Sequence, residues 1–83
     1  MTVTTDVNWG PLDRRLNNDS AIIQEFMWMY SDEGNGVEYY KHASTRRYLL
    51  LGRDGQCYQQ GAPGLVKVEF DSELRRVRGL EAH

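Results

Sequence analysis

Cys57 and His42 are the two residues of this chain whose types could carry out nucleophilic chemistry. A thiolate activated by a neighbouring imidazole, with a carboxylate beside it, is a common catalytic arrangement. Both residues fall in segments that we expect to be strands, and they would have to meet across the sheet. A lone Cys on a strand beside Leu49 to Leu51 is more typical of a small core residue. We therefore expect no enzyme, and a small enzyme around Cys57 and His42 is the least favoured interpretation.

The sequence lacks the residues that a metal site or a phosphate site requires. His42 and His83 do not have the spacing of metal ligands, and a single Cys cannot build a zinc site. The Gly-Arg-Asp-Gly stretch at 52–55 is a turn, because no helix is predicted to begin after it as a phosphate-binding loop requires. We expect neither a metal ion nor a cofactor.

A basic and aromatic segment indicates binding. Residues 39–53 contain four bases, three tyrosines and no acid. On alternating strands, Tyr40 and His42 share one face, while Tyr39 and Lys41 share the other. Trp28 adds a second candidate contact. The residues that we predict to contact a partner are Tyr40, Lys41, His42, Arg46, Arg47, Tyr48, Arg53 and Trp28.

The chemistry of this segment suits two classes of partner. Aromatic rings beside cations bind single-stranded nucleic acid, since bases stack on the rings and Arg neutralises phosphates. The planar guanidinium of Arg suits carboxylates equally well. Because the chain has a formal net charge of −2, we favour a protein partner with an acidic surface. The predicted role is a regulator, inhibitor or accessory subunit, and RNA or single-stranded nucleic acid is the alternative.

Residues 36–46 resemble part of a WW module, from its first turn through its middle strand. The resemblance rests on the paired aromatics Tyr39 and Tyr40, followed by His42 and Thr45. Leu49 stands where the second Trp of that pattern is expected, and no Pro follows it. The groove that binds proline-rich peptides would lack this Trp, so we do not assign the chain to the family.

The elements that must position these residues form one α+β domain spanning residues 1–83, since 83 residues leave room for one core. Apolar residues at helical spacing predict one amphipathic helix over about 20–31, capped by Asp19 or Ser20. From Val37 the period changes to two. An antiparallel meander of four to five strands is therefore expected, at about 37–42, 46–51, 56–60, 65–71 and 74–78.

Trp28 falls on the polar side of that predicted helix. Either it anchors a partner, because Trp is enriched at interface hot spots, or the amino-terminal segment covers it through Trp9 or Leu16. The Asp54-Gly55 pair predicts a hairpin whose register depends on its loop length. Residues 1–10 are expected to be an arm or an edge strand, and residues 80–83 a frayed tail.

Charge and hydropathy give the remaining expectations. The first 36 residues carry two bases and six acids, whereas the rest of the chain carries eight bases and six acids. No apolar run is long enough to cross a bilayer, and the start lacks the pattern of a signal peptide. We expect a cytoplasmic protein that does not bind a membrane. Since a meander leaves unpaired edges, a homodimer through an edge strand is also compatible with the pattern.

Overall fold

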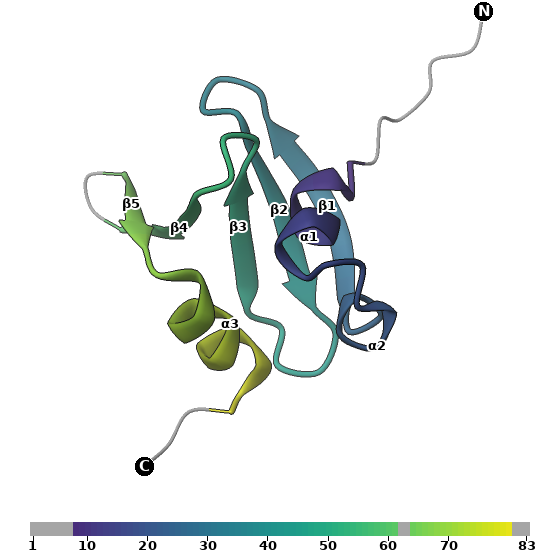
Figure 1. The fold of residues 1–83 in the computed structure, drawn as a ribbon. Helices are drawn as coiled ribbons and strands as arrows, with labels where there is room; N and C mark the ends of the chain where they lie inside the picture. The colour runs from purple at the N-terminus through teal and green to yellow at the C-terminus, as the bar shows by residue number, and fades with distance from the viewer. Residues whose placement is uncertain (1–7, 62–63, 81–83) are drawn as a thin grey trace, which may run out of the picture.

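A five-stranded antiparallel sheet forms the centre of the protein, and helices lie against one of its faces (Figure 1). The computed structural model describes residues 8–61 and 64–80. Each strand pairs with the next one along the chain. The strands are β1 (Phe26–Asp32), β2 (Val37–His42), β3 (Tyr48–Gly52), β4 (Cys57–Gln60) and β5 (Leu65–Val68), and the helices are α1 (Gly10–Arg15), α2 (Ser20–Ile23) and α3 (Phe70–Arg78). The predicted α+β class and the antiparallel meander are confirmed.

Two short helical segments precede the sheet. Pro11 lies in the first turn of α1, where a missing backbone N–H costs nothing. The helix ends before Asn17 and Asn18, whose φ angles of 51° and 59° are left-handed. Asp19 then caps α2, because its side chain accepts a hydrogen bond from the Ala21 N–H.

The predicted helix over residues 20–31 is wrong beyond its first turn. α2 ends at Ile23, and the chain continues as strand β1 from Phe26. Residues 26–30, Phe-Met-Trp-Met-Tyr, include three large aromatics, which favour a pleated surface. Pairing with β2 at every residue of β1 except Met29 provides the backbone hydrogen bonds that a helix would otherwise supply.

A β-bulge at Met29 explains why this strand is hidden in the sequence. Trp28 pairs with Tyr40, but Tyr30 pairs with Tyr39, so that Met29 is an extra residue without a partner. An extra residue shifts the alternation of side chains by one position. The apolar residues then lose their period of two and adopt spacings that resemble those of a helix.

The predicted strand over residues 74–78 is also wrong, because this segment belongs to α3. The Glu69 side chain accepts hydrogen bonds from two backbone N–H groups of the first turn. Gly79 ends the helix in the left-handed conformation, with φ at 75°. Phe70 and Val77 lie seven residues apart and are both buried in the core. The predicted strand over 65–71 is shortened to β5 for the same reason, and the other three predicted strands match within two residues.

The hairpin between β3 and β4 has a three-residue loop. Leu51 pairs with Cys57, and the Gly52 N–H donates to the Gln56 carbonyl at 2.8 Å. Gly55 occupies the left-handed region at φ 86°, as the last residue of such a loop requires. This settles the register that the Asp-Gly pair alone left open.

The predicted arm over residues 1–10 and the predicted tail over residues 80–83 fall largely outside the described residues. Within the described part, Trp9 precedes α1 and its ring lies 5.5 Å from that of Tyr40. Leu80 follows α3, and its backbone N–H donates to the Arg75 carbonyl.

The main core lies between the helices and one face of the sheet, which we call the covered face. Trp28, Tyr40 and Leu49 form one cross-strand row of this face. The buried residues of the main core are Phe26, Tyr40, Leu49, Leu51 and Cys57 of the sheet, with Leu12, Phe70 and Val77 of the helices.

Glu25 joins the carboxyl-terminal helix to the start of the sheet. Its carboxylate accepts two hydrogen bonds from the Arg78 guanidinium, both at 2.9 Å. His42 Nε2 lies 2.9 Å from the same carboxylate, and His42 Nδ1 accepts the Thr45 N–H, which places the proton on Nε2. The Arg78 hydrogen bond is the main cause that lowers the pKa of Glu25 from 4.5 to about 2, against the opposing effect of burial.

Replacing Glu25 by Gln tests this connection through the pH dependence of stability. The pKa of Glu25 is lower in the folded state, so its contribution is complete above pH 4.5 and disappears as the pH falls towards 2. At pH 7, we expect Glu25→Gln to lower the free energy of unfolding by about 1 to 2 kcal/mol after solvent screening. Urea denaturation at several pH values should find this difference shrinking below pH 4.5.

Arg78→Met should abolish the same pH-dependent contribution, and Arg75→Met on the exposed side of α3 is the matched control. A Glu25→Gln variant whose deficit is the same at pH 7 and pH 2 would contradict the ion pair.

Candidate functional site

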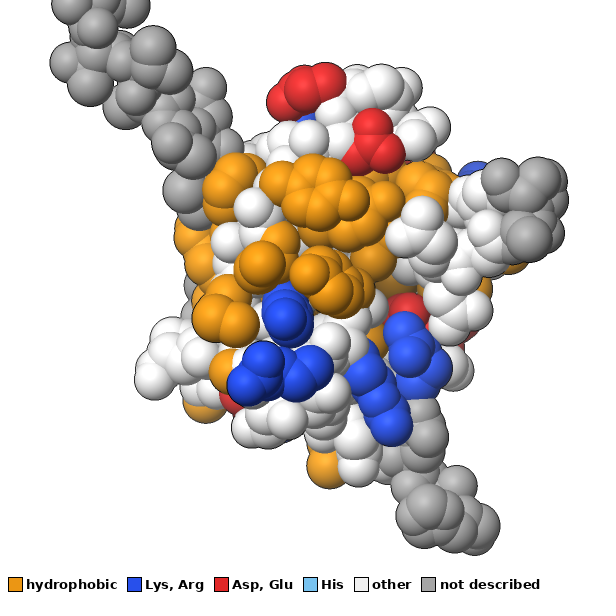
Figure 2. Space-filling view, turned by 180° about the vertical axis from the view of Figure 1, so that it is seen from behind, with side chains coloured by type: hydrophobic (Ala, Val, Ile, Leu, Met, Phe, Trp, Pro, Cys, Tyr) orange, Lys and Arg blue, Asp and Glu red, His pale blue; other side chains and the backbone are white. Residues whose placement is uncertain are grey.

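No helix of the described residues lies over the second face of the sheet, which we call the uncovered face. Figure 2 views it and shows hydrophobic side chains gathered at its centre, with Lys and Arg side chains along one border. Strand pairing arranges the face in cross-strand rows. The lysine row is Met27, Lys41 and Tyr48; the tyrosine row is Tyr30, Tyr39, Leu50 and Tyr58; the aspartate row is Asp32, Val37 and Gly52.

Large apolar side chains on β1 are exposed to solvent. Met27 is 44 % exposed, Met29 is 38 % exposed and Tyr30 is 49 % exposed. Met27 belongs to the lysine row, and the bulge at Met29 lets Tyr30 turn to the same face. Three adjacent exposed residues of this size mark an interaction surface more often than scattered ones do.

The tyrosines of the uncovered face pack on one another. The Tyr30 and Tyr39 rings are stacked, with centroids 4.4 Å apart and planes 19° apart. Tyr48 meets Tyr39 edge to face at 6.3 Å. Burial, helped by the Tyr30 side chain, raises the pKa of Tyr39 to about 12. Only Tyr30 keeps half of its surface open to solvent.

A pocket of about 230 Å³ lies where β3 and β4 separate. These two strands pair only at Leu50 with Tyr58 and at Leu51 with Cys57, so the rest of their length is open. Side chains of α3 line this opening together with strand residues. The lining residues are Tyr48, Leu50, Gln59, Gln60, Glu73 and Arg76.

The polar groups of this pocket already bind one another. Glu73 is 4 % exposed, and its carboxylate accepts hydrogen bonds from Arg76 at 2.9 and 2.7 Å. The Gln59 amide donates to the same carboxylate at 3.1 Å. The pocket is therefore a polar hollow beside the tyrosine row, where a side chain of a partner could enter.

Two of the residues predicted to contact a partner lie in the covered face. Tyr40 is completely buried, and its hydroxyl donates to the Asn8 carbonyl at 2.6 Å. His42 is 5 % exposed and contacts Glu25. The prediction that they share a face is confirmed, but the helices cover that face.

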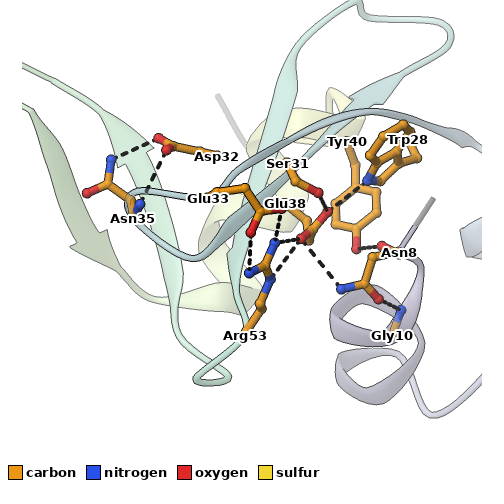
Figure 3. A network of polar contacts seen from close by, with 10 residues as sticks. All are labelled: Asn8, Gly10, Trp28, Ser31, Asp32, Glu33, Asn35, Glu38, Tyr40 and Arg53. Carbon is orange, nitrogen blue, oxygen red and sulfur yellow. Dashed lines mark hydrogen bonds and ion pairs between the residues drawn. The ribbon is translucent and has the colours of Figure 1, made fainter. Parts of the chain in front are cut away.

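Trp28 and Arg53 converge on the buried carboxylate of Glu38 (Figure 3). The Trp28 indole N–H donates to Glu38 Oε1 at 2.8 Å. Trp28 is partly buried and packs against the main core, as do Trp9 and Leu16. This packing favours the second of the two interpretations, a covered ring, over an anchor for a partner.

Arg53 makes two ion pairs. Its guanidinium donates to Glu38 Oε2 at 3.0 and 2.8 Å and to both oxygens of Glu33 at 3.1 and 3.0 Å. These carboxylates raise the pKa of Arg53, that of Glu33 having the larger effect. Arg53 is thus engaged within the chain, at the end of the sheet opposite Lys41.

Glu38 also stabilises the bulge in β1 through hydrogen bonds on both sides of it. Both Trp28 and Ser31 donate to its Oε1 atom, although they are three residues apart on one strand. Strict alternation would place them on opposite faces, so the extra residue Met29 is what allows both contacts. Burial of Glu38 favours the protonated form, but the hydrogen bonds from Ser31, Trp28 and Arg53 outweigh it and lower its pKa.

The other four predicted contact residues lie on or beside the uncovered face. Lys41 lies on it, with Nζ 5.8 Å from the Tyr48 ring centre. Arg46 is exposed in the β2–β3 turn with a left-handed φ of 66°. Arg47 is bonded to the Arg76 carbonyl at the end of α3. Lys41, Arg46 and Tyr48 therefore stay in the candidate site.

Cys57 and His42 do not meet. Strand β3 separates β4 from β2, and Cys57 lies in the cross-strand row of Leu51 and Glu38, away from His42. Burial raises the pKa of the Cys57 thiol to about 12, which disfavours the thiolate. Among the described residues, no three His, Cys, Asp or Glu side chains are grouped so that they could hold a metal ion.

Sequence reasoning missed the exposed residues of β1. The predicted helix over 20–31 has Met27, Met29 and Tyr30 among the apolar residues of its buried side, and Tyr39 is not among the predicted contacts. A search for alternation that allows one inserted residue would have found Phe26 and Trp28 on one face, with Ser31 after the insertion.

Comparisons with known proteins do not assign a family. No protein-family model, no curated protein and no solved structure matches this chain. In the described part of the chain, no helix is both long enough and apolar enough to cross a membrane.

Replacing Glu38 by Gln tests the buried network. The change leaves Arg53 facing an amide in a site where the carboxylate side chain is completely buried, and we expect a loss of about 2 to 4 kcal/mol in the free energy of unfolding. Glu33→Gln is the matched control, because Glu33 binds the same Arg53 with a side chain that is 77 % exposed. This control should lose less than about 1 kcal/mol.

Denaturant titration followed by Trp fluorescence measures both variants. Equal losses for Glu38→Gln and Glu33→Gln would contradict a special role for the buried carboxylate.

Proposed function

We propose that this protein is a binding module whose uncovered sheet face binds another protein chain. The observation that carries the proposal is the pair of exposed apolar side chains Met27 and Tyr30 of β1 on a face that no described helix covers, with the exposed bulge residue Met29 between them in the chain. Apolar and aromatic anchors with a charged border are typical of protein interfaces. A regulator, inhibitor or accessory subunit would work by such a contact.

A protein partner suits this face better than single-stranded nucleic acid does. Stacking of bases needs open ring faces, but Tyr39 is 5 % exposed and its ring is stacked against Tyr30. Methionines such as Met27 adapt to the side chains of a partner. The formal net charge of −2 gives no general attraction for phosphates.

The face can be tested by making it polar. We expect the double variant Met27→Ser, Tyr30→Ser to lower the affinity for a partner by at least about tenfold, because apolar anchors dominate binding energy. The wild-type chain and the variant are used as bait in extracts of the native host, and the captured proteins are compared quantitatively.

Val66→Ser is the matched control, because Val66 is an equally exposed apolar residue on β5, at 50 %. A partner retained by the control and lost by the double variant supports the proposal. A set of captured proteins that is the same for all three chains would refute it.

Single-stranded RNA tests the alternative predicted from the sequence. We expect a titration with oligouridylate and mixed oligonucleotides at low salt to give no saturable change in fluorescence anisotropy, since the tyrosines stack on one another. Saturable binding that weakens steeply with salt and is lost in Lys41→Glu would replace a protein partner by nucleic acid.

A further inference from the structure

The uncovered face carries opposite charges at the two ends of its strands. Lys41 lies at the β2–β3 end, and Arg46 follows it in the turn. At the other end, Asp32 closes β1 and Asp54 lies in the β3–β4 loop. Asp54 belongs to this face, because the Tyr58 hydroxyl donates to it at 2.9 Å. Figure 2 shows the same order, with acidic and basic side chains on opposite borders of the apolar centre.

Neighbouring charges do not cancel this difference. At the acidic end, Glu33 and Glu38 share Arg53, and Lys67 of β5 pairs with Tyr58. Among the described residues, that end therefore holds four acids, Asp32, Asp54, Glu33 and Glu38, and two bases, Arg53 and Lys67. At the basic end, the carboxylates of Glu25 and Glu73 are each paired with an arginine of α3, so they leave Lys41 and Arg46 uncompensated.

We propose that the partner bound by the uncovered face is a second copy of this chain. The inference rests on the proposed function and names its partner. A face that is acidic at one end, apolar in the middle and basic at the other is complementary to itself when one copy is reversed. A two-fold axis brings the same patch of both copies together, and such self-complementarity is what it requires.

The charges determine the direction of that axis. It lies between the two faces and runs across the strands, parallel to the tyrosine row. The tyrosine row of one copy then packs on that of the other, and the lysine row of each copy faces the aspartate row of its partner. An axis parallel to the strands would instead bring the two basic ends together and the two acidic ends together.

This arrangement differs from the edge-strand homodimer predicted from the sequence. Pairing through the outer edge of β1 would satisfy backbone groups but leave Met27 and Tyr30 facing water. Contact between the faces removes these two side chains from water in both copies, and apolar burial is the main source of affinity.

Charge reversal at the two ends provides a test in which each variant weakens the dimer, but the two variants together restore it. In a homodimer of Lys41→Glu, the Glu on β2 lies one strand away from Asp32 on β1 of the other copy, at both ends of the interface; in a homodimer of Asp32→Lys, the new Lys lies equally near Lys41 of the other copy. When the two variants are mixed, the Glu of one chain lies near the new Lys of the other chain, and the remaining Asp32 lies near the remaining Lys41. Sedimentation equilibrium should give each variant alone a dissociation constant at least about tenfold above that of the wild type, and the mixture a constant near that of the wild type.

Arg14→Glu on α1 is the matched control, since Arg14 is exposed on the covered side, and it should dimerise as the wild type does. Circular dichroism checks that each variant is folded. If Asp32→Lys does not fold, because Asp32 caps its turn by accepting from Asn35, the salt dependence of the wild-type dimer replaces it. The dimer should then weaken as salt rises from 0.05 to 0.5 M by about tenfold.

The outcomes separate this inference from the proposed function. If the wild-type chain stays monomeric up to about 1 mM, the partner is not a second copy of this chain. The proposal of a protein-binding face is then tested by the capture experiment alone. A dimer with the same dissociation constant in Lys41→Glu, or one whose variants do not recover on mixing, overturns the reversed packing. If the dimer is also unchanged by Met27→Ser with Tyr30→Ser, the uncovered face is not the contact.

Discussion

The buried carboxylate of Glu38 is the contact on which the rest of the sheet depends. It accepts hydrogen bonds from Trp28 and Ser31 of β1 and pairs with Arg53 of the β3–β4 loop. Because Trp28 and Ser31 must point to the same side to reach it, β1 needs the extra residue Met29. Removing one of these partners from a desolvated charge strongly destabilises the fold. One acid therefore fixes the register of the edge strand and the position of a loop.

That register decides which side chains meet solvent. Phe26 and Trp28 turn to the covered face and complete the core with the helices. Met27 and Tyr30 are left on the uncovered face, where Tyr30 covers Tyr39 without being covered itself. Helices as short as α1 and α2 can cover only one face of five strands. The candidate binding surface is therefore a consequence of how the core is completed.

Part of the fold could be predicted because the local pattern and the tertiary structure agree. β2 contains no inserted residue, so its side chains alternate between the two faces along its whole length, and Asp19 is a good cap wherever a helix follows. β1 could not be found in the same way, since its bulge depends on Glu38, which lies six residues beyond the end of β1. α3 carried local signals in its Glu69 cap and its Gly79 end, but the alternating residues before it favoured a strand.

The basic and aromatic character of the candidate site could be predicted, but only some of its residues could. The basic and aromatic composition of residues 39–53 directed attention to the hairpin, and Lys41, Arg46 and Tyr48 do border the uncovered face. Tyr40 and His42 belong to the core, because alternation separates two faces without indicating which one the helices will cover. Trp28 and Arg53 are held by Glu38, a contact between residues 10 and 15 positions apart.

The sequence by itself determined an α+β meander, the start of the helical turn that follows Asp19 and a charge difference along the chain. These follow from local spacing, turn residues and composition, which act within a few residues. Only the tertiary structure decided the bulge in β1, the covered side of the sheet and the separation of acidic and basic ends on the other side. Those features depend on contacts between distant residues, above all the desolvation of Glu38 and the packing of helices against one face, and no local pattern contains them.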